Sequence, residues 1–391
     1  MTSLSKTRIE SIDLLRGAVI IIMALDHVRG YFHADHFLFS PTDLTKTTPI
    51  LFFTRWITHF CAPAFVFLAG TSAFFVSQRK SKNELSRFLF TRGLWLMVLE
   101  LTVVNFGWFF NPEFPFLSFQ VIWALGVSMI ALSALIHLPQ KVILAIGLII
   151  LFGHNLLDNI HVDGNSFKAF LWAELHDRKS FTFLGRIFRT GYPVLAWIGI
   201  MTLGYSFGSF YKKEIDAQKR KKYLLTIGAS AITLFFVIRA FNAYGDMAPW
   251  TIYDNSISTI LSFLNVSKYP PSLLYTLVTL GPCMIFLALA EKPLGKMGLA
   301  ISTVGRVPMF FYILHIYFIH ALAMLAITFT DKSWKDMIMV GNKNPQLEGY
   351  GFSLWVVYLV WIAVILLLYP LCKRYDTYKT NHKEKWWLSY L

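Results

Sequence analysis

Three ionisable residues stand inside an apolar segment near the start of the chain. The stretch MALDHVRG places Asp26, His27 and Arg29 directly after the apolar run AVIII. Asp26 and Arg29 are three residues apart, so on a helix they can form an ion pair on one face. A neutral imidazole can act as a base near neutral pH. Ionisable groups in a membrane helix typically mark a functional cavity, and a purely structural ion pair is the competing interpretation.

A second histidine supports chemistry at this place. His59 precedes the apolar run CAPAFVFLAGTSAFF. If the segments 13–33 and 56–77 are consecutive antiparallel helices, His59 enters the membrane from the outer side. At about 1.5 Å per residue, His27 lies roughly 20 Å from the inner face, so the two imidazoles reach a similar depth. Together with Asp26 they predict a reactive polar site at the outer end of one helical hairpin.

Other polar residues fall at a similar estimated depth. Asn105, Gln120 and Arg239 stand near the outer ends of three further apolar segments. Each alone is typical of a packing or interfacial residue, but together they predict an outward-facing pocket. Glu100 and His315 lie deeper, where a proton path is one interpretation and simple packing is the other.

Three arginines mark the opposite side of the membrane. Arg16, Arg92 and Arg306 each stand where an apolar segment begins, in LLRG, FTRGL and VGRVP. The guanidinium fork suits phosphate groups, and helix N-termini favour anions. Anchoring to lipid headgroups is the competing interpretation for each of them.

The elements that must position these residues are membrane helices. The chain is 55% hydrophobic and 17% aromatic but only 15% charged, which excludes an ordinary soluble domain. A bilayer needs about 20 mostly apolar residues per helix. We therefore expect an all-α polytopic bundle, one domain over residues 1–391, with about ten membrane helices. The expected segments are 13–33, 56–77, 87–109, 117–137, 141–157, 190–210, 222–241, 271–290, 307–328 and 352–372.

The basic residues predict how the bundle is oriented. QRKSKNELSR, YKKEIDAQKRKK and the tail KRYDTYKTNHKEK all fall on one side. Positive loops favour the cytoplasm, so we expect a multi-pass inner-membrane protein with both termini cytoplasmic. The long connections 34–55, 154–189, 242–270 and 329–351 then lie outside. Within them, the aromatic and basic segment 165–189 is expected to form an interfacial helix or an eleventh, re-entrant element.

Charge and cysteine usage exclude other partners. The net charge of +14 comes from short basic stretches between apolar segments, so no nucleic-acid partner is expected. Cys61, Cys283 and Cys372 form no CxxC pair, and His315 and His320 stand five residues apart, which is not a strong metal spacing. We expect neither a metal nor a disulfide framework.

Five ordered stretches resemble a known family. They are RIESIDLLRGAVIIIMALDHVRGYF, FFTRWITHFCAPAFVFLAGTSAF, KYPPSLLYTLVTLGP, GRVPMFFYILHIYFIH and the terminal YPLCKRY…WWLSYL. Together they are similar to the bacterial DUF1624 family, which belongs with the heparan-alpha-glucosaminide N-acetyltransferase catalytic domain in the transmembrane acyltransferase group. The resemblance runs through almost the whole chain.

The resemblance implies a membrane enzyme that takes an acyl group from cytoplasmic acyl-CoA and passes it to a sugar-like hydroxyl or amine on the far side. In the family's pattern a catalytic histidine follows the first core helix and an aspartate precedes the second. Here His33 and His36 lie in that loop at a different spacing, His59 takes the place of the aspartate, and His27 takes the place of an asparagine.

Acyl transfer needs a base, an oxyanion donor and tight positioning. Our hypothesis makes His59 or His27 the base, with Asp26 accepting a hydrogen bond that fixes its tautomer. A covalent acyl-histidine intermediate is an alternative. Arg29, Asn105, Gln120 and Arg239 would bind the oxyanion or the acceptor, and Arg16, Arg92 and Arg306 the phosphates of acetyl-CoA or another acyl-CoA.

A proton-coupled secondary transporter of a small polar solute is the main competitor, because buried Asp, His and Glu also build proton relays. It predicts interrupted helices in matching halves of the chain, and no internal repeat is visible. The expected partners are the lipid bilayer and a sugar or glycan acceptor. The sequence leaves open the acceptor, the acyl chain and homo-oligomerisation.

Overall fold

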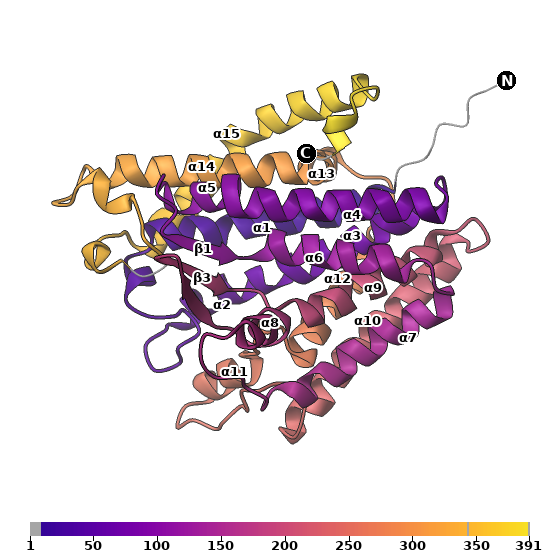
Figure 1. Cartoon of the computed structure of the whole chain (residues 1–391), viewed down its shortest axis with the longest axis horizontal. Coiled ribbons are helices and arrows are strands. Elements are labelled where there is room, and N and C mark those ends of the chain that lie inside the picture. The colour runs from indigo at the N-terminus through magenta and orange to yellow at the C-terminus, as the bar shows by residue number, and fades with distance from the viewer. Residues whose placement is uncertain (1–8, 342–343, 390–391) are drawn as a thin grey trace.

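The chain folds into a helical bundle with one small sheet (Figure 1). The computed structural model describes residues 9–341 and 344–389, so the outermost residues of both predicted cytoplasmic ends lie outside the described part. The α-helices are α1 Glu10–Phe32, α2 Pro49–Trp56, α3 Cys61–Ser77, α4 Lys82–Leu99, α5 Asn105–Phe109, α6 Val121–Leu135, α7 Gln140–Gly153, α8 Phe167–Leu175, α9 Val194–Phe207, α10 Ala217–Phe241, α11 Ser256–Leu264, α12 Leu273–Leu289, α13 Lys296–Arg306, α14 Pro308–Ile327 and α15 Leu354–Asn381.

Each of the expected membrane segments contains a helix, although the segment 117–137 begins on a strand. Among the described residues, 7 helical stretches are long and apolar enough to cross a membrane. They are Pro49–Ser77, Lys82–Phe109, Gln140–Leu157, Val194–Tyr211, Ala217–Phe241, Pro308–Ile327 and Leu354–Asn381. Helices α6 and α12 are apolar but shorter, and α1 carries Asp13, Arg16, Asp26 and Arg29 along its length. The all-α, membrane-spanning class is therefore confirmed, while a count of about ten spans stays a prediction.

The segment expected to be interfacial or re-entrant forms a short helix and a hairpin instead. After α8, strand β2 (Ser180–Phe183) pairs antiparallel with β3 (Arg186–Thr190), and β3 pairs in parallel with β1 (Phe116–Phe119). The strand order is β1-β3-β2. The sequence reasoning missed this sheet, because its strands are short and paired residues of β1 and β3, such as Phe116 and Ile187, stand 71 positions apart.

Helix α1 lies at the centre of the bundle and packs against α3, α13, α14 and α15. Two glycines allow it to cross α13 closely. A Cβ atom on Gly17 would lie 2.0 Å from the carbonyl oxygen of Ile301, and one on Gly305 would lie 2.0 Å from that of Asp13. Small residues at a helix crossing let two backbones approach each other. This crossing brings the start of α1 beside the end of α13, and so Arg16 beside Gly305.

The connections divide between two ends of the bundle. In Figure 1 the α3–α4 and α9–α10 connections lie at one end, and α2, α8, α11 and the sheet lie toward the other. Helix α4 begins with a capping box in which Ser81 and Glu84 exchange hydrogen bonds. A π-helical turn at Glu100–Val104 then carries α4 into α5. The long connections contain the short helices α2, α8 and α11 between irregular stretches.

Candidate active site

A cavity of about 1090 Å³ runs along one face of α1. Arg16, Ile20, Met23, His27 and Gly30 all line it, and their spacing of three or four residues is that of one helical face. About 1.5 Å of rise per residue separates Arg16 from His27 by roughly 16 Å. The predicted site residues that line this cavity are Arg16, Asp26, His27, Arg29, His59, Arg92, Gln120 and Arg306.

Asp26 lies between two guanidinium groups. Arg29 donates from Nε and Nη2 to Oδ1 of Asp26, at 3.2 and 3.0 Å, so the expected pair on one face of α1 is present. Arg55 of α2 donates to the other carboxylate oxygen. Sequence reasoning missed Arg55, although its position in FFTRW, inside an apolar segment, was the available signal. Neither His27 nor His59 is a hydrogen-bond partner of Asp26 among the described residues, so the tautomer role expected for this carboxylate is not seen.

The hydrogen-bond partner of His27 is another histidine. Nδ1 of His27 lies 2.7 Å from Nε2 of His315 on α14, and the two rings stack at 4.9 Å. Nδ1 of His315 lies 2.9 Å from the carbonyl oxygen of Phe311, which can only accept. When both rings are neutral, His315 therefore carries its proton on Nδ1 and accepts at Nε2. Consequently His27 donates from Nδ1, and its Nε2 is the basic nitrogen.

Glu100 takes no part in this pair. Its Oε2 accepts hydrogen bonds from the backbone N–H groups of Ile122 and Trp123, at 2.9 and 3.1 Å. A carboxylate at these positions caps the first turn of α6. The proton path considered for Glu100 and His315 is thus replaced by two separate arrangements, a helix cap and a histidine pair.

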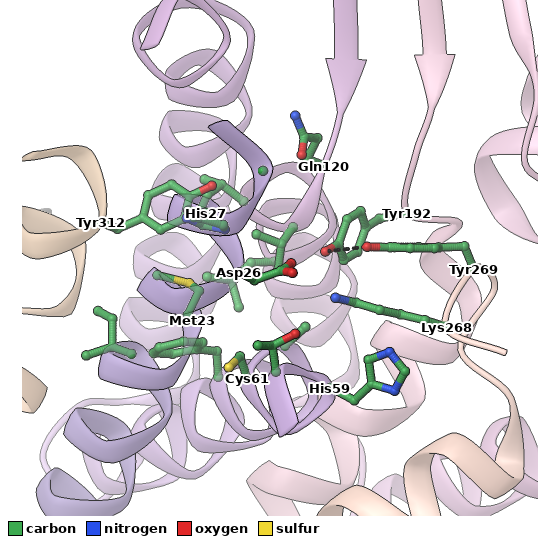
Figure 2. Close-up of a pocket in the computed structure, with 18 of the residues that line it drawn as sticks. Met23, Asp26, His27, His59, Cys61, Gln120, Tyr192, Lys268, Tyr269 and Tyr312 are labelled. Carbon is green, nitrogen blue, oxygen red and sulfur yellow. Dashed lines mark hydrogen bonds between the residues drawn. The ribbon is translucent and has the colours of Figure 1, made fainter. Parts of the chain in front are cut away.

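His59 stands on the short 3-10 helix Ile57–Phe60 and is 3% exposed. Its ring contacts Tyr275 edge-on at 5.4 Å, and the Tyr275 hydroxyl donates to the His59 carbonyl oxygen at 2.8 Å. Nδ1 of His59 is buried with no hydrogen-bond partner in the described part of the chain. In the view of Figure 2, His27 and His59 lie on opposite sides of Asp26.

A cluster of cations and tyrosines lines the end of the cavity that contains Asp26 and His59. The sequence reasoning missed this cluster. Lys268 lies over the ring of Tyr269 at 5.2 Å, and the Arg178 guanidinium lies over that ring at 4.7 Å. The Tyr269 hydroxyl donates to that of Tyr192 at 3.2 Å, as Figure 2 shows. Burial raises the pKa of Tyr269, but the positive charges of Lys268 and Arg55 outweigh it and lower that pKa to about 7.

His36 also lines this end of the cavity, from the loop that follows α1. Its Nδ1 lies 3.5 Å from Nη1 of Arg29. Burial, together with the neighbouring Arg29 charge, lowers the pKa of His36 to about 3. His36 is therefore neutral at physiological pH and can accept a hydrogen bond from a guanidinium or a ligand.

Two predicted site residues are not among those that line the cavity. Asn105 donates to the Phe116 carbonyl oxygen and accepts from the Ser118 N–H, at 3.0 and 3.3 Å, which fixes β1. Arg239 is 1% exposed, and its guanidinium donates only to backbone carbonyl oxygens in the connection that contains α11. The expected roles of both in a pocket are replaced by structural ones.

The other end of the cavity contains the three arginines expected to meet phosphate. Arg16 donates to Asp13, to the Gly305 carbonyl oxygen and to Ser72. Arg306 donates from Nε to Asp376 of α15 at 2.8 Å. The Arg92 guanidinium lies 5.8 Å from the Phe88 ring centre. Lys379 lines the cavity here as well, so four cationic side chains gather at this end.

A sequence model of one family matches this chain. Its description is heparan-alpha-glucosaminide N-acetyltransferase, catalytic, and the match covers residues 8–239. That range includes the elements with Asp26, His27 and His59, whereas Lys268 and His315 lie beyond it. The resemblance expected over almost the whole chain is thus shown for its first part. No curated protein matches the chain.

Proposed function

We propose, because the chain belongs to the heparan-alpha-glucosaminide N-acetyltransferase catalytic family, that it moves an acyl group from acyl-CoA to an acceptor through the cavity along α1. The observation that carries the proposal is that one cavity has the cations Arg16, Arg92, Arg306 and Lys379 at one end and three histidines, His27, His36 and His59, at the other. Acyl-CoA would bind from the cytoplasm, and the acceptor from the opposite side. The family itself is one of membrane acetyltransferases, and the helices of this chain agree with a membrane protein.

In this proposal the donor binds at the end with Arg16, Arg92, Arg306 and Lys379. Guanidinium groups bind phosphate oxygens through paired donors, and an ammonium adds a point charge. The pantetheine arm would then extend along α1, over the roughly 16 Å between Arg16 and His27. The cavity of about 1090 Å³ exceeds the usual size of a pocket for one drug-sized ligand, as a long donor and an acceptor require.

His27 is the general base of the proposed reaction. Its Nε2 takes the proton from the acceptor hydroxyl or amine while the acceptor atom bonds to the thioester carbonyl carbon. The tetrahedral intermediate then collapses, the carbon–sulfur bond breaks, and the CoA sulfur receives the proton from His27. His315 stabilises the imidazolium by accepting from Nδ1, because that hydrogen bond strengthens as His27 becomes charged. His59 is the second candidate base, on the opposite wall.

Lys268 is the best candidate to stabilise the oxyanion. Both Arg29 and Arg55 already bond to Asp26, while Lys268 has no ion-pair partner among the described residues and its ammonium lies over the rings of Tyr192 and Tyr269. A preorganised positive charge at the point where negative charge develops lowers the reaction barrier. Asn105, the other donor expected for this role, is used to hold β1.

The acceptor end favours a sugar that carries an anionic group. Arg178, Arg189 and Lys268 add three positive charges there, and Asp26 is already paired with two arginines. Tyr192 and Tyr269 line this end of the cavity, and a pyranose can pack against an aromatic ring. We therefore propose a hexosamine with a carboxylate, phosphate or sulfate on the same or the neighbouring ring.

Proteoliposomes test the proposal directly. The purified full chain is reconstituted with glucosamine 6-sulfate inside the vesicles and labelled acetyl-CoA outside, and labelled product inside is measured. We expect product with the wild type and with His137→Ala, an exposed control. The His27→Ala variant should lose at least 100-fold in rate, as removal of a general base does. Full turnover by both His27→Ala and His59→Ala would remove the assignment, and proton-coupled sugar uptake without acyl transfer would favour a transporter.

A further inference from the structure

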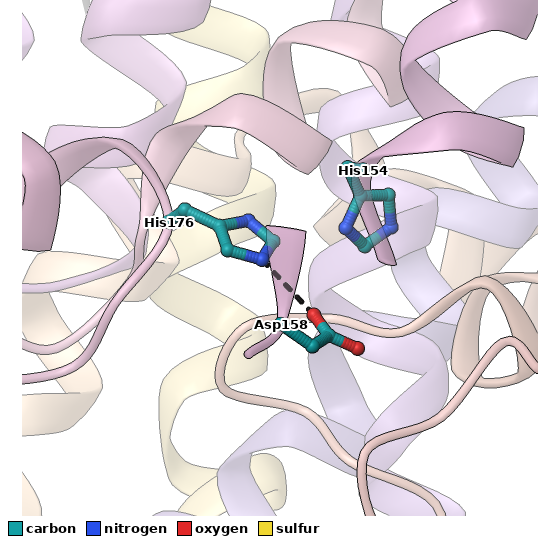
Figure 3. Close-up of side chains that lie close together, drawn as sticks. All are labelled: His154, Asp158 and His176. Atoms are coloured by element: carbon teal, nitrogen blue, oxygen red, sulfur yellow. Dashed lines mark hydrogen bonds and ion pairs between the residues drawn. The ribbon is translucent and has the colours of Figure 1, made fainter. Parts of the chain in front are cut away.

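A second cluster of chemically capable side chains lies outside the cavity. His154, Asp158 and His176 each offer one ligand atom, and these atoms all lie within 4.8 Å of one another. Figure 3 shows the two imidazoles and the carboxylate facing a common point. We propose that they bind one divalent transition-metal ion, zinc by preference, because two imidazoles and one carboxylate are a ligand set that zinc favours.

The local structure explains why these residues meet. His154 begins the 3-10 helix His154–Leu157 that continues α7, and Asp158 follows it directly, so the two side chains stand one turn apart. His176 is the residue after α8, and its backbone N–H donates to the Trp172 carbonyl oxygen at 2.8 Å. Trp172 in turn donates from Nε1 to the Ile160 carbonyl oxygen at 2.7 Å. This bond holds α8 against the connection that carries Asp158.

Several ring nitrogens of the two histidines in this cluster are buried without a hydrogen-bond partner in the described residues. His154 is 2% exposed, and both of its ring nitrogens are buried without a hydrogen-bond partner in the described residues. His176 is 3% exposed, and its Nδ1 is also buried without a hydrogen-bond partner in the described residues. Buried polar atoms without partners are rare in native proteins, because nothing replaces the water they lose. A metal ion coordinated by His154 supplies a partner for one of its two ring nitrogens.

The carboxylate is oriented by its own neighbours. Asp158 Oδ1 lies 2.9 Å from Nε2 of His176, and its Oδ2 accepts from the Asn155 amide at 2.8 Å. The Asn155 Oδ1 then accepts from the backbone N–H of Leu273, at the start of α12, at 2.9 Å. Hydrogen bonds of this kind orient metal ligands. The proposed ion would therefore connect α7, α8 and the start of α12.

The distances require a small closure. Tetrahedral zinc with bonds of about 2.1 Å keeps its ligand atoms about 3.4 Å apart. Since the atoms here all lie within 4.8 Å of one another, no pair must approach by more than about 1.4 Å. Rotation of the His154 ring, which no hydrogen bond holds, allows this. Three protein ligands leave the fourth position to water.

The expected consequence is structural. His176 stands two residues before Arg178, which lines the acceptor end of the cavity. The ion would fix the segment from which Arg178 extends, without contact with the reacting groups. The proposal itself does not depend on acyl transfer, because binding and stability are its readouts.

Metal analysis tests it. The full chain is purified in detergent without a histidine tag, stripped with EDTA, exposed to zinc chloride and freed of unbound ion, and its zinc content is measured. We expect about one zinc per chain for the wild type and for His161→Ala, a control histidine in the same connection. His154→Gln and His176→Gln should each lower that value at least fivefold. Zinc should raise the unfolding temperature of the first two proteins only.

Two results would overturn the proposal. One is wild-type protein that binds less than a tenth of an equivalent of zinc, cobalt, nickel or manganese and shows no thermal shift with any of them. The other is full zinc content in both glutamine variants. If a glutamine variant does not fold, the visible spectrum of cobalt added to stripped wild type decides, because nitrogen and oxygen ligands in a low-symmetry site give strong bands and free aqueous cobalt does not.

Discussion

Replacing His315 examines the proposed base without touching the substrate. His315→Phe keeps a ring of similar size but removes the atom that accepts from Nδ1 of His27, 2.7 Å away. A neutral hydrogen bond contributes about 0.5–1.5 kcal/mol and one from a charged donor about 1.5–3 kcal/mol. The difference of about 1–1.5 kcal/mol arises only in the transition state, when His27 is an imidazolium. We therefore expect kcat to fall about 5- to 13-fold with KM for both substrates unchanged.

The assay is steady-state release of CoA thiol by the reconstituted chain. His315→Gln offers an amide oxygen in place of Nε2, so it should recover most of the lost kcat. Tyr317→Phe is the matched control, because it removes a hydrogen bond from the same helix, to the Val103 carbonyl oxygen, away from His27. Wild-type kcat in His315→Phe would refute the reasoning. A rise in KM that His315→Gln does not reverse would assign His315 to packing alone.

Three further predictions concern the rest of the cavity. Arg306→Gln should raise KM for acetyl-CoA about tenfold and leave kcat unchanged, as loss of one charged phosphate contact does; steady-state kinetics would show a falling kcat if the residue served structure only. A near-ultraviolet titration of tyrosinate should find one group near pH 7, absent from Tyr269→Phe and moved upward in Lys268→Gln. Because this folded pKa lies below the unfolded value of about 10, its contribution to stability is absent below pH 7 and grows up to pH 10. Gly17→Ala should lower the free energy of unfolding by about 1–3 kcal/mol or more, since its Cβ would meet backbone, whereas Gly295→Ala, with open space around it, should change it little; equal unfolding temperatures for both would contradict the close crossing.

The helices and the part of the site on α1 follow from the sequence because both depend on local spacing. Apolar segments of sufficient length predict membrane helices wherever water is absent. Asp26 and Arg29 could be paired in advance because residues three apart share a helical face. For the same reason Arg16 and His27 could be placed on one helix at a known separation.

Asn105 and Arg239 were assigned wrongly because the sequence gives the depth of a residue along a helix but not the side on which its side chain points. Asn105 and Arg239 were assigned to the pocket because their positions along two helices matched that of His27. The rotation of a helix about its own axis depends on its neighbours, and here it turns Asn105 toward β1 and Arg239 toward the connection with α11. A single long-range contact, such as that of His27 with His315, was equally out of reach because 288 positions separate the two.

The acceptor end was missed for a different reason. Lys268 and Tyr269 come from the connection before α12, Arg178 from the turn between α8 and β2, and Arg55 from α2. No local pattern in any of these stretches predicts its contact with the others, because residues of separate connections meet only when the whole chain folds. The cluster His154, Asp158 and His176 also joins two such elements, although the spacing of its first two residues was a usable signal.

This division between helices and loops has a consequence for specificity. The proposed base and its partner stand on α1 and α14, where the rings pack in the core and a change of shape disturbs both helices. The residues that would contact the acceptor stand instead on connections at one end, where substitution leaves helix packing intact. We therefore expect acceptor preference to respond to changes at Arg178 and Arg189 with the rate of acyl-CoA hydrolysis by water unaltered, because water needs His27 and Lys268 but not the other acceptor contacts. Loss of both activities in Arg178→Gln would show instead that the hairpin positions the helices.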